Sequence, residues 1–269
     1  LENPERPDKP FPLVLLVLNL AGYRNLTRLI SLSYTEKQGH GEPQLRREWL
    51  QANAEGLIAL SGGMTGELGR ALLESDRVTA RAVLDDYMRL FPNRFYIELQ
   101  RCGRQGEESY LQAAVQLAAE TGCPVVATND VRFINSEDFE AHEVRVCIHE
   151  RRTLDDPRRP RHYSEQQYLR SPEEMLELFD DLPEAIENTV QIARRCTLEL
   201  ELGKPYLPNY PVPEGLTMDE FFRQISRQGL DQHLPRLFRE IRGAQAPEDE
   251  FSGFCQPYYE RLDFELDVI

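Results

Sequence analysis

Four short apolar runs, each followed by a segment with the spacing of a helix, restrict this chain to very few folds. The runs are Leu13–Leu20, Gly56–Leu60, Arg94–Gln100 and Val125–Ala127. A repeated order of strand and helix is the pattern of βα units, which build a parallel sheet or a barrel. We therefore predict an α/β fold with a mainly parallel sheet and helices outside it.

The last of these runs ends abruptly at polar residues. Val125–Ala127 gives way to Thr128, Asn129 and Asp130. In parallel α/β folds, side chains at the carboxyl ends of strands line the functional site, so Asp130 is a candidate catalytic or metal-binding carboxylate. The local sequence is equally compatible with Asn129 and Asp130 only turning the chain and capping the next helix.

The charge of the chain bears on its partners. Its 269 residues carry a formal net charge of −15, whereas nucleic-acid-binding domains usually carry a basic excess. Contact with DNA is therefore expected only elsewhere or through a local arginine patch. No apolar run approaches the about 20 residues of a membrane-spanning helix, so we expect no membrane contact. The five cysteines are widely spaced and form no C-x-x-C motif, which favours free thiols in a reducing cytoplasm.

Glycine and capping signals mark several element ends. Gly22 is expected to break the first run before a helix over Tyr23–Tyr34. Gly122, in the usual C-terminal position, ends an amphipathic helix over Glu107–Thr121. A capping box with proline at the first helical position opens Pro172–Leu178.

The composition changes after residue 202. Gly203–Gly215 contains four prolines and is typical of an extended linker. A helix follows over Asp219–Leu234, which Pro235 should end or kink, and a loop is expected over 243–253. The predicted parts are therefore residues 1–202, a linker over 203–215, and a helical segment over 216–269.

No familiar catalytic motif is complete. Ser61–Gly63 follows a strand but lacks the spacing and the lysine of a P-loop, so a strand-to-helix turn is the simpler interpretation. His142 and His149 lie two helical turns apart, too far to share one ion easily. Glu98, alone on its strand, is a weak indication of a site. The arginine-rich loop Arg151–Arg161 is either a solvated loop or a docking surface.

Six longer motifs carry a resemblance that runs nearly end to end: Leu60–Gly63, Glu107–Leu111, Val126–Asp130, Asp138–Glu143, Thr153–Pro157 and Tyr259–Leu266. Together they resemble the amino-terminal region of the bacterial replicative DNA polymerase III alpha subunits. The resemblance implies a PHP (polymerase and histidinol phosphatase) domain over residues 1–202, a distorted βα barrel that is incomplete here because its first strands are missing. It also implies that residues 216–269 begin the polymerase palm.

The same resemblance implies a metal site from which this chain departs. Asp130 keeps the aspartate of the family's Asp-x-His motif, whereas Arg132 replaces its histidine, Gly63 replaces a cysteine and Pro12 replaces another histidine. Arginine has no lone pair for a metal and would neutralise the aspartate beside it. Such sites use about three or four protein ligands, so we expect Asp130 to be a vestige that binds no ion.

The resemblance also implies a function for the longer protein. It would be the catalytic subunit of the DNA polymerase III holoenzyme, a cytoplasmic, nucleoid-associated DNA-directed DNA polymerase. Its Mg²⁺ ions would be held by palm carboxylates beyond Ile269, so this chain is expected to be inactive and without a cofactor. The PHP domain would act structurally and dock the proofreading exonuclease subunit, while other replisome subunits and DNA would contact other parts. The alternatives are an active metal-dependent phosphoesterase or 3′–5′ exonuclease, and an unrelated acidic scaffold.

Overall fold

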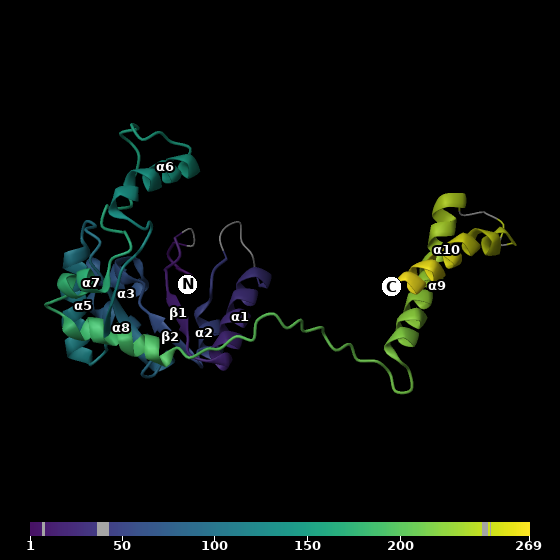
Figure 1. Cartoon of the computed structure of the whole chain (residues 1–269), viewed down its shortest axis with the longest axis horizontal. Coiled ribbons are helices and arrows are strands. Elements are labelled where there is room, and N and C mark those ends of the chain that lie inside the picture. Colours follow the sequence, from purple (N-terminus) through teal and green to yellow (C-terminus); the bar gives the residue numbers. More distant parts are fainter. Residues whose placement is uncertain (7–8, 37–42, 244–246, 248) are drawn as a thin grey trace. The chain divides into compact units, whose positions relative to one another are not determined.

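The computed structural model describes residues 1–6, 9–36, 43–243, 247 and 249–269. The chain forms two compact units, Leu1–Leu200 and Glu201–Ile269 (Figure 1). Unit 1 contains the sheet, and unit 2 contains two long helices. In the first part of unit 2, residues 203–213 form neither helix nor strand and are exposed, apart from a half-buried Val212.

Unit 1 is built on one open sheet of four strands in the order β1-β2-β3-β4: Val14–Val17, Leu57–Leu60, Phe95–Gln100 and Val125–Thr128. β2, β3 and β4 run parallel, so the predicted α/β fold with a mainly parallel, incomplete sheet is confirmed. β1 is the exception, because it runs antiparallel to β2. Among the described residues, two helices, α1 (Leu20–Thr35) and α2 (Arg47–Ala52), lie between β1 and β2. The end of β1 lies beside the start of β2, because the Leu18 N–H donates to the Gly56 carbonyl at 2.9 Å.

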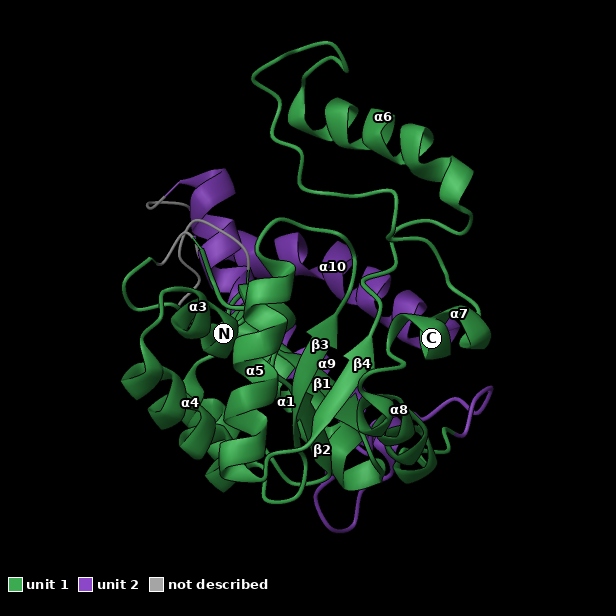
Figure 2. Ribbon diagram, turned by 90° about the vertical axis from the view of Figure 1, so that its left-hand side faces the viewer, with its two compact units in different colours: residues 1–200 green, residues 201–269 purple. Residues whose placement is uncertain are grey.

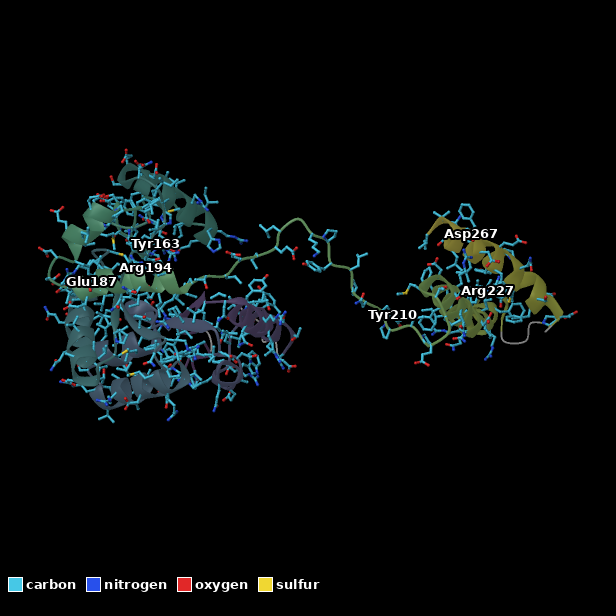
Figure 3. All side chains as sticks on the ribbon, turned by 60° about the horizontal axis from the view of Figure 1, so that its bottom comes forward. Tyr163, Glu187, Arg194, Tyr210, Arg227 and Asp267 are labelled. Atoms are coloured by element: carbon cyan, nitrogen blue, oxygen red, sulfur yellow. The ribbon has the colours of Figure 1, made fainter. Side chains whose placement is uncertain are left out.

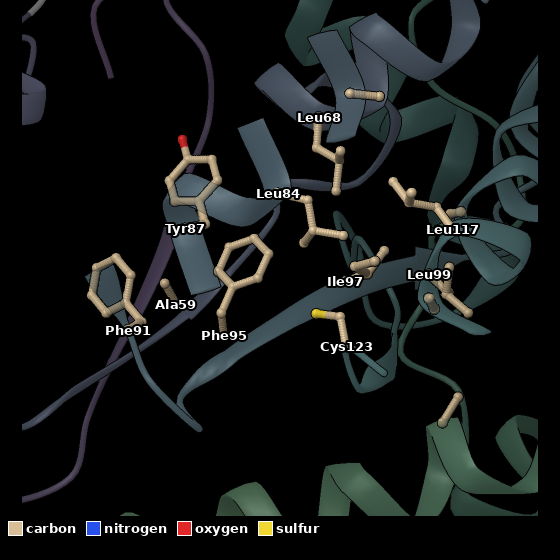
Figure 4. Packing of buried hydrophobic residues seen from close by; sticks show 14 of the residues in the cluster. Ala59, Leu68, Leu84, Tyr87, Phe91, Phe95, Ile97, Leu99, Leu117 and Cys123 are labelled. Atoms are coloured by element: carbon tan, nitrogen blue, oxygen red, sulfur yellow. The ribbon is translucent and has the colours of Figure 1, made fainter. Parts of the chain in front are cut away.

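The strands bury alternate residues on two faces, as the period of a strand requires. Ala59, Phe95 and Ile97 belong to a large apolar cluster together with Leu84 and Tyr87 of α4, Arg77–Leu90 (Figure 4). The rings of Tyr87 and Phe95 stack with their centroids 4.8 Å apart. On the opposite face of the sheet lies a smaller apolar cluster that includes Ile192 of α8, Pro183–Arg195. The sheet is therefore covered by helices on both faces.

Ten α-helices are found in the described residues: α1 Leu20–Thr35, α2 Arg47–Ala52, α3 Glu67–Leu73, α4 Arg77–Leu90, α5 Glu107–Thr121, α6 Phe139–Glu150, α7 Pro172–Leu178, α8 Pro183–Arg195, α9 Met218–Arg242 and α10 Asp249–Val268. α5 and α7 have the predicted bounds. Gly122 ends α5 with φ of 70°, a left-handed conformation that glycine adopts at little cost. None of these helices has the length and apolar composition that crossing a membrane requires.

The predicted break at Gly22 is wrong. The first strand stops at Val17, and α1 begins at Leu20 with Gly22 inside its first turn. The side chain of Asn19 caps the helix by accepting a hydrogen bond from the Gly22 N–H. A Cβ on Gly22 would lie 1.9 Å from the carbonyl oxygen of Gly56, so glycine is needed here for a close approach of two backbones.

Unit 2 narrows one prediction and corrects another. α9 continues past Pro235, so the helix does not end there, although proline removes a helical hydrogen bond. Its residue Phe238 is buried and packs edge-on against Phe251 and Phe254 of α10, so contact between the helices outweighs the local preference. α10 already begins at Asp249, so the loop predicted over 243–253 is too long; residues 244–246 and 248 lie outside the described part.

The free edge of β4 is covered by α8. The Asn188 side-chain amide donates to the Val125 carbonyl at 2.8 Å, and the Thr189 hydroxyl donates to the Ala127 carbonyl at 3.1 Å. These two side chains occupy carbonyls that a further strand would otherwise pair. The sheet is therefore open, but side chains of α8 donate hydrogen bonds to two carbonyl groups on its outer edge.

Candidate functional site

The carboxyl ends of β3 and β4 lie side by side at one end of the sheet. α6 and its flanking loops project beyond that end (Figure 2). Asp130 lies in the segment that leaves β4. This segment is held by the chain that returns from α6, because the Arg132 N–H donates to the Gln167 carbonyl at 2.8 Å and Phe133 forms a β-bridge with Tyr168. The predicted position of Asp130 at the end of its strand is thus confirmed.

Both carboxylate oxygens of Asp130 are bound by cationic or amide groups. Oδ1 lies 2.8 Å from a guanidinium nitrogen of Arg132, as expected from the sequence. Oδ2 lies 3.2 Å from a guanidinium nitrogen of Arg104 and accepts a hydrogen bond of 2.9 Å from the Gln167 amide. The carboxylate therefore joins three segments that are distant in sequence.

Arg104 has a wider role that sequence reasoning missed. Its guanidinium also donates to the Gln100 side-chain oxygen and to Glu107 at 3.3 Å. The Glu107 carboxylate in turn accepts hydrogen bonds from the backbone N–H groups of Cys102 at 2.6 Å and Gly103 at 2.8 Å. Arg104 precedes α5, whose first residue is Glu107, so the available signal was only the short separation of two opposite charges in the sequence.

A second polar group lies on β3 and β4. Glu98 is buried, and its Oε1 accepts hydrogen bonds from the Thr128 hydroxyl at 2.6 Å and the Gln100 amide at 3.1 Å. Its Oε2 is buried without a hydrogen-bond partner among the described residues. Glu98 was a weak indication in the sequence, and it connects through Gln100 to the Arg104 guanidinium.

The other positions expected at the site lie near this network. A Cβ on Gly63 would approach the Gln100 side-chain oxygen to 3.1 Å, and a Cβ on Gly62 would approach the Pro12 carbonyl oxygen to 2.3 Å. Pro12 and Gly63 have no side-chain metal donor. Within the part of the chain that the structure describes, no three His, Cys, Asp or Glu side chains are grouped as metal ligands.

Cys102, His142 and His149 are the remaining candidate metal ligands, and each lies in different surroundings. Burial raises the pKa of the Cys102 thiol, which favours the protonated form rather than the thiolate that binds metals. The His142 ring packs between the rings of Phe133 and Tyr163, with centroids 5.5 and 4.6 Å away, and burial lowers its pKa. His149 is exposed at the end of α6. The two histidines therefore do not form a pair.

The loop over 151–161 is less solvated than its composition indicates. The Arg159 side chain is only 7% exposed and forms an ion pair with Glu143 of α6, itself 6% exposed. Arg158, by contrast, is 86% exposed. The loop is therefore anchored to α6 by one arginine while its neighbour faces solvent.

Comparison with known proteins identifies similar chains. The family model of the PHP domain matches residues 2–102. Proteins named DNA polymerase III subunit alpha are 53% identical over 96% of this chain in Pseudomonas aeruginosa, 49% over 96% in Escherichia coli K12 and 47% over 100% in Vibrio cholerae. The chain spans about a fifth of the length of these curated relatives, 21% or 22%.

Proposed function

Because the chain belongs to the family of bacterial DNA polymerase III alpha subunits, we propose that it is the PHP-containing region of a replicative DNA polymerase. In this proposal the region stabilises the polymerase and docks its proofreading exonuclease subunit, and it hydrolyses nothing itself. The observation that carries the proposal is the pairing of both Asp130 oxygens with Arg132 and Arg104.

This pairing bears directly on metal chemistry. A divalent ion bound by Asp130 would have to displace two guanidinium groups, which are permanent cations without a lone pair. Pro12, Gly63 and Arg132 offer no replacement ligand, while metal hydrolases need about three or four protein ligands. A scaffold that keeps its fold and lacks these ligands is better suited to binding a protein than to hydrolysis.

DNA synthesis itself is assigned to other parts of the longer protein. We place the start of the polymerase palm in residues 216–269, and the carboxylates that hold Mg²⁺ for nucleotidyl transfer beyond them. Other replisome subunits and DNA would bind there too, in the cytoplasm at the nucleoid. The net charge of −15 supports this division, because it disfavours contact between this chain and phosphate backbones.

The test uses the full-length protein and two measurements. Isothermal titration with the purified exonuclease subunit should show saturable binding. Phosphatase and nuclease assays of the same preparation, with added manganese or zinc and without the exonuclease subunit, should show no metal-dependent turnover. Turnover without exonuclease binding would establish the alternative, an active phosphoesterase or 3′–5′ exonuclease.

A further inference from the structure

One face of α6 has no partner within the described part of unit 1. The helix projects beyond the end of the sheet (Figure 2), and neither apolar cluster of the described residues includes any of its side chains. Its inner face carries the buried Glu143 and Cys147, which lie one turn apart. The opposite side is exposed and will be called the outer face of α6; it consists of Ala141, Val144, Arg145 and Ile148.

Contacts on the inner side fix how α6 is turned. Glu143 forms an ion pair with Arg159, and the two side chains are only 6% and 7% exposed. The His142 ring meets the Tyr163 ring edge-on (Figure 3), with the centroids 4.6 Å apart. Rotating the helix to hide its outer face would separate this buried charge pair, which is costly. The outer face is therefore a fixed part of the surface of unit 1.

The outer face offers a short apolar stripe. Ile148 is 73% exposed, and Val144, one turn before it, is 38% exposed. Isolated apolar side chains are ordinary on the surface of soluble proteins. The stripe by itself therefore identifies no binding site, and its charged surroundings decide what it could bind.

The charge around the stripe is opposite to that of the chain. Residues 141–159 contain five arginines and four acids, a net charge of +1 with the histidines neutral, whereas the whole chain carries −15. Three of the four acids are half-buried or buried, so the exposed charged residues are Asp155 and the arginines Arg145, Arg151, Arg152 and Arg158. At physiological salt, charges more than about 8 Å away are largely screened, so this local excess governs contacts at the outer face.

The four exposed arginines differ in how far they are engaged. Arg152 and Arg158 share Asp156, each at 3.3 Å. The guanidinium groups of Arg145 and Arg151 make no hydrogen bond or ion pair with any described residue. Their N–H donors are therefore available to a carboxylate, which an arginine can bind through two parallel hydrogen bonds.

We propose that the outer face of α6 binds an acidic segment of a partner protein that carries apolar side chains among its carboxylates. The carboxylates pair with Arg145 and Arg151, and an apolar side chain packs on Ile148, since arginine and apolar anchors together are typical of protein interfaces. A nucleic acid fits less well, because no aromatic side chain is exposed in residues 139–159 to stack with a base. The inference goes beyond the proposed function and holds whether or not the exonuclease subunit supplies the segment.

The test measures fluorescence anisotropy of labelled synthetic peptides titrated with the full-length protein at physiological salt. The first peptide carries leucine and glutamate at helical spacing, the second has lysine for glutamate, and the third has serine for leucine. We expect saturable binding of the first, weaker binding of the third and none of the second. Equal binding of the lysine peptide, or binding of no peptide, would overturn the proposal. Displacement of the first peptide by an equal concentration of a single-stranded oligodeoxynucleotide would also overturn it, because the surface would then favour nucleic acid.

Paired variants locate the surface. Ile148→Gln and Arg145→Gln should each weaken binding of the leucine–glutamate peptide about tenfold, with an unchanged circular dichroism spectrum because both side chains are exposed. Val78→Gln and Arg89→Gln are the matched controls, since they remove an 82% exposed valine and a 79% exposed arginine of α4; they should leave binding unchanged.

Two results from these variants would contradict the assignment to α6. They are unchanged binding by Ile148→Gln and Arg145→Gln, and equal losses in the α4 controls. An exonuclease titration of the parent protein that fails while the peptide still binds would count only against the proposed function.

Discussion

The guanidinium of Arg104 joins the segments that meet at the carboxyl end of the sheet. It contacts Gln100 at the end of β3, Glu107 at the start of α5 and Asp130 after β4. Arginine suits this position because its donors are arranged in a rigid fork and it stays charged at any physiological pH. In this chain, an internal cation therefore does what a metal ion could do in holding acidic side chains together.

Replacing Arg104 by methionine, which keeps much of the side-chain bulk, should lower the free energy of unfolding by about 3 kcal/mol, because the buried Glu107 carboxylate loses its cation. Urea unfolding followed by circular dichroism measures the change. Arg81→Met is the matched control, since its ion pair with Asp85 is exposed and should contribute less than about 0.5 kcal/mol. Equal losses in the two variants would contradict a special role for Arg104.

A single histidine at position 132 should not create a metal site. In Arg132→His, Asp130 keeps its contact with Arg104, and Pro12 and Gly63 still offer no ligand. Mass-spectrometric metal analysis after incubation with zinc or manganese should find no stoichiometric metal, as in the parent protein. One equivalent of either metal in the variant alone would show that position 132 by itself controls the site.

At the scale of helices and strands, signals within one turn predicted the ends of elements well. Gly122 and the capping box at Ser171 act through neighbouring backbone groups, so α5 and α7 could be placed from sequence. The cap at Asn19, where α1 starts, is also a local signal, but the need for glycine at position 22 depends on a close approach to Gly56 that no local pattern contains. The passage of α9 through Pro235 likewise depends on packing against α10.

Contacts at the candidate site also divide into those between near neighbours in the sequence and those between distant segments. Asp130 and Arg132 are two residues apart, so their pairing could be predicted from the sequence alone. Arg104 reaches Asp130 only because the parallel register of β3 and β4 brings the loop after one beside the segment after the other. Gln167 reaches the same carboxylate from a still later segment. Arg104 and Gln167 could therefore be identified as partners of Asp130 only from the structure.

Gly22→Ala should lower the free energy of unfolding of unit 1 by about 3 kcal/mol or more, because its Cβ would overlap the Gly56 carbonyl and force the backbones apart. Thermal or urea unfolding would measure this. Gly229→Ala in α9 is the comparison: no atom lies within 4 Å of its added Cβ, so that helix should gain about 0.5–1 kcal/mol. A neutral Gly22→Ala variant would contradict the close approach.

At the scale of the whole molecule, the two units are joined by exposed chain. Tyr206 and Leu207 are 68% and 87% exposed and lie outside any helix or strand. Limited digestion with chymotrypsin should therefore cut first near these residues, and mass spectrometry should recover a resistant fragment ending near them. First cuts within α3, α4 or α5 would show that unit 1 is less stable than its packing indicates. A Tyr206→Ser, Leu207→Ser variant should be cut there more slowly.

The cover that α8 gives to β4 also sets an order of events during synthesis. β4 is complete at Thr128, whereas Asn188 and Thr189, which bind its edge carbonyls, emerge only after α6 and α7 have been made. During that interval the nascent chain carries a strand with open hydrogen-bonding groups, the feature by which incomplete sheets recruit strands from other chains. A chain whose synthesis stops within this interval keeps that strand edge unpaired, so we expect it to aggregate more readily than a chain that has completed α8.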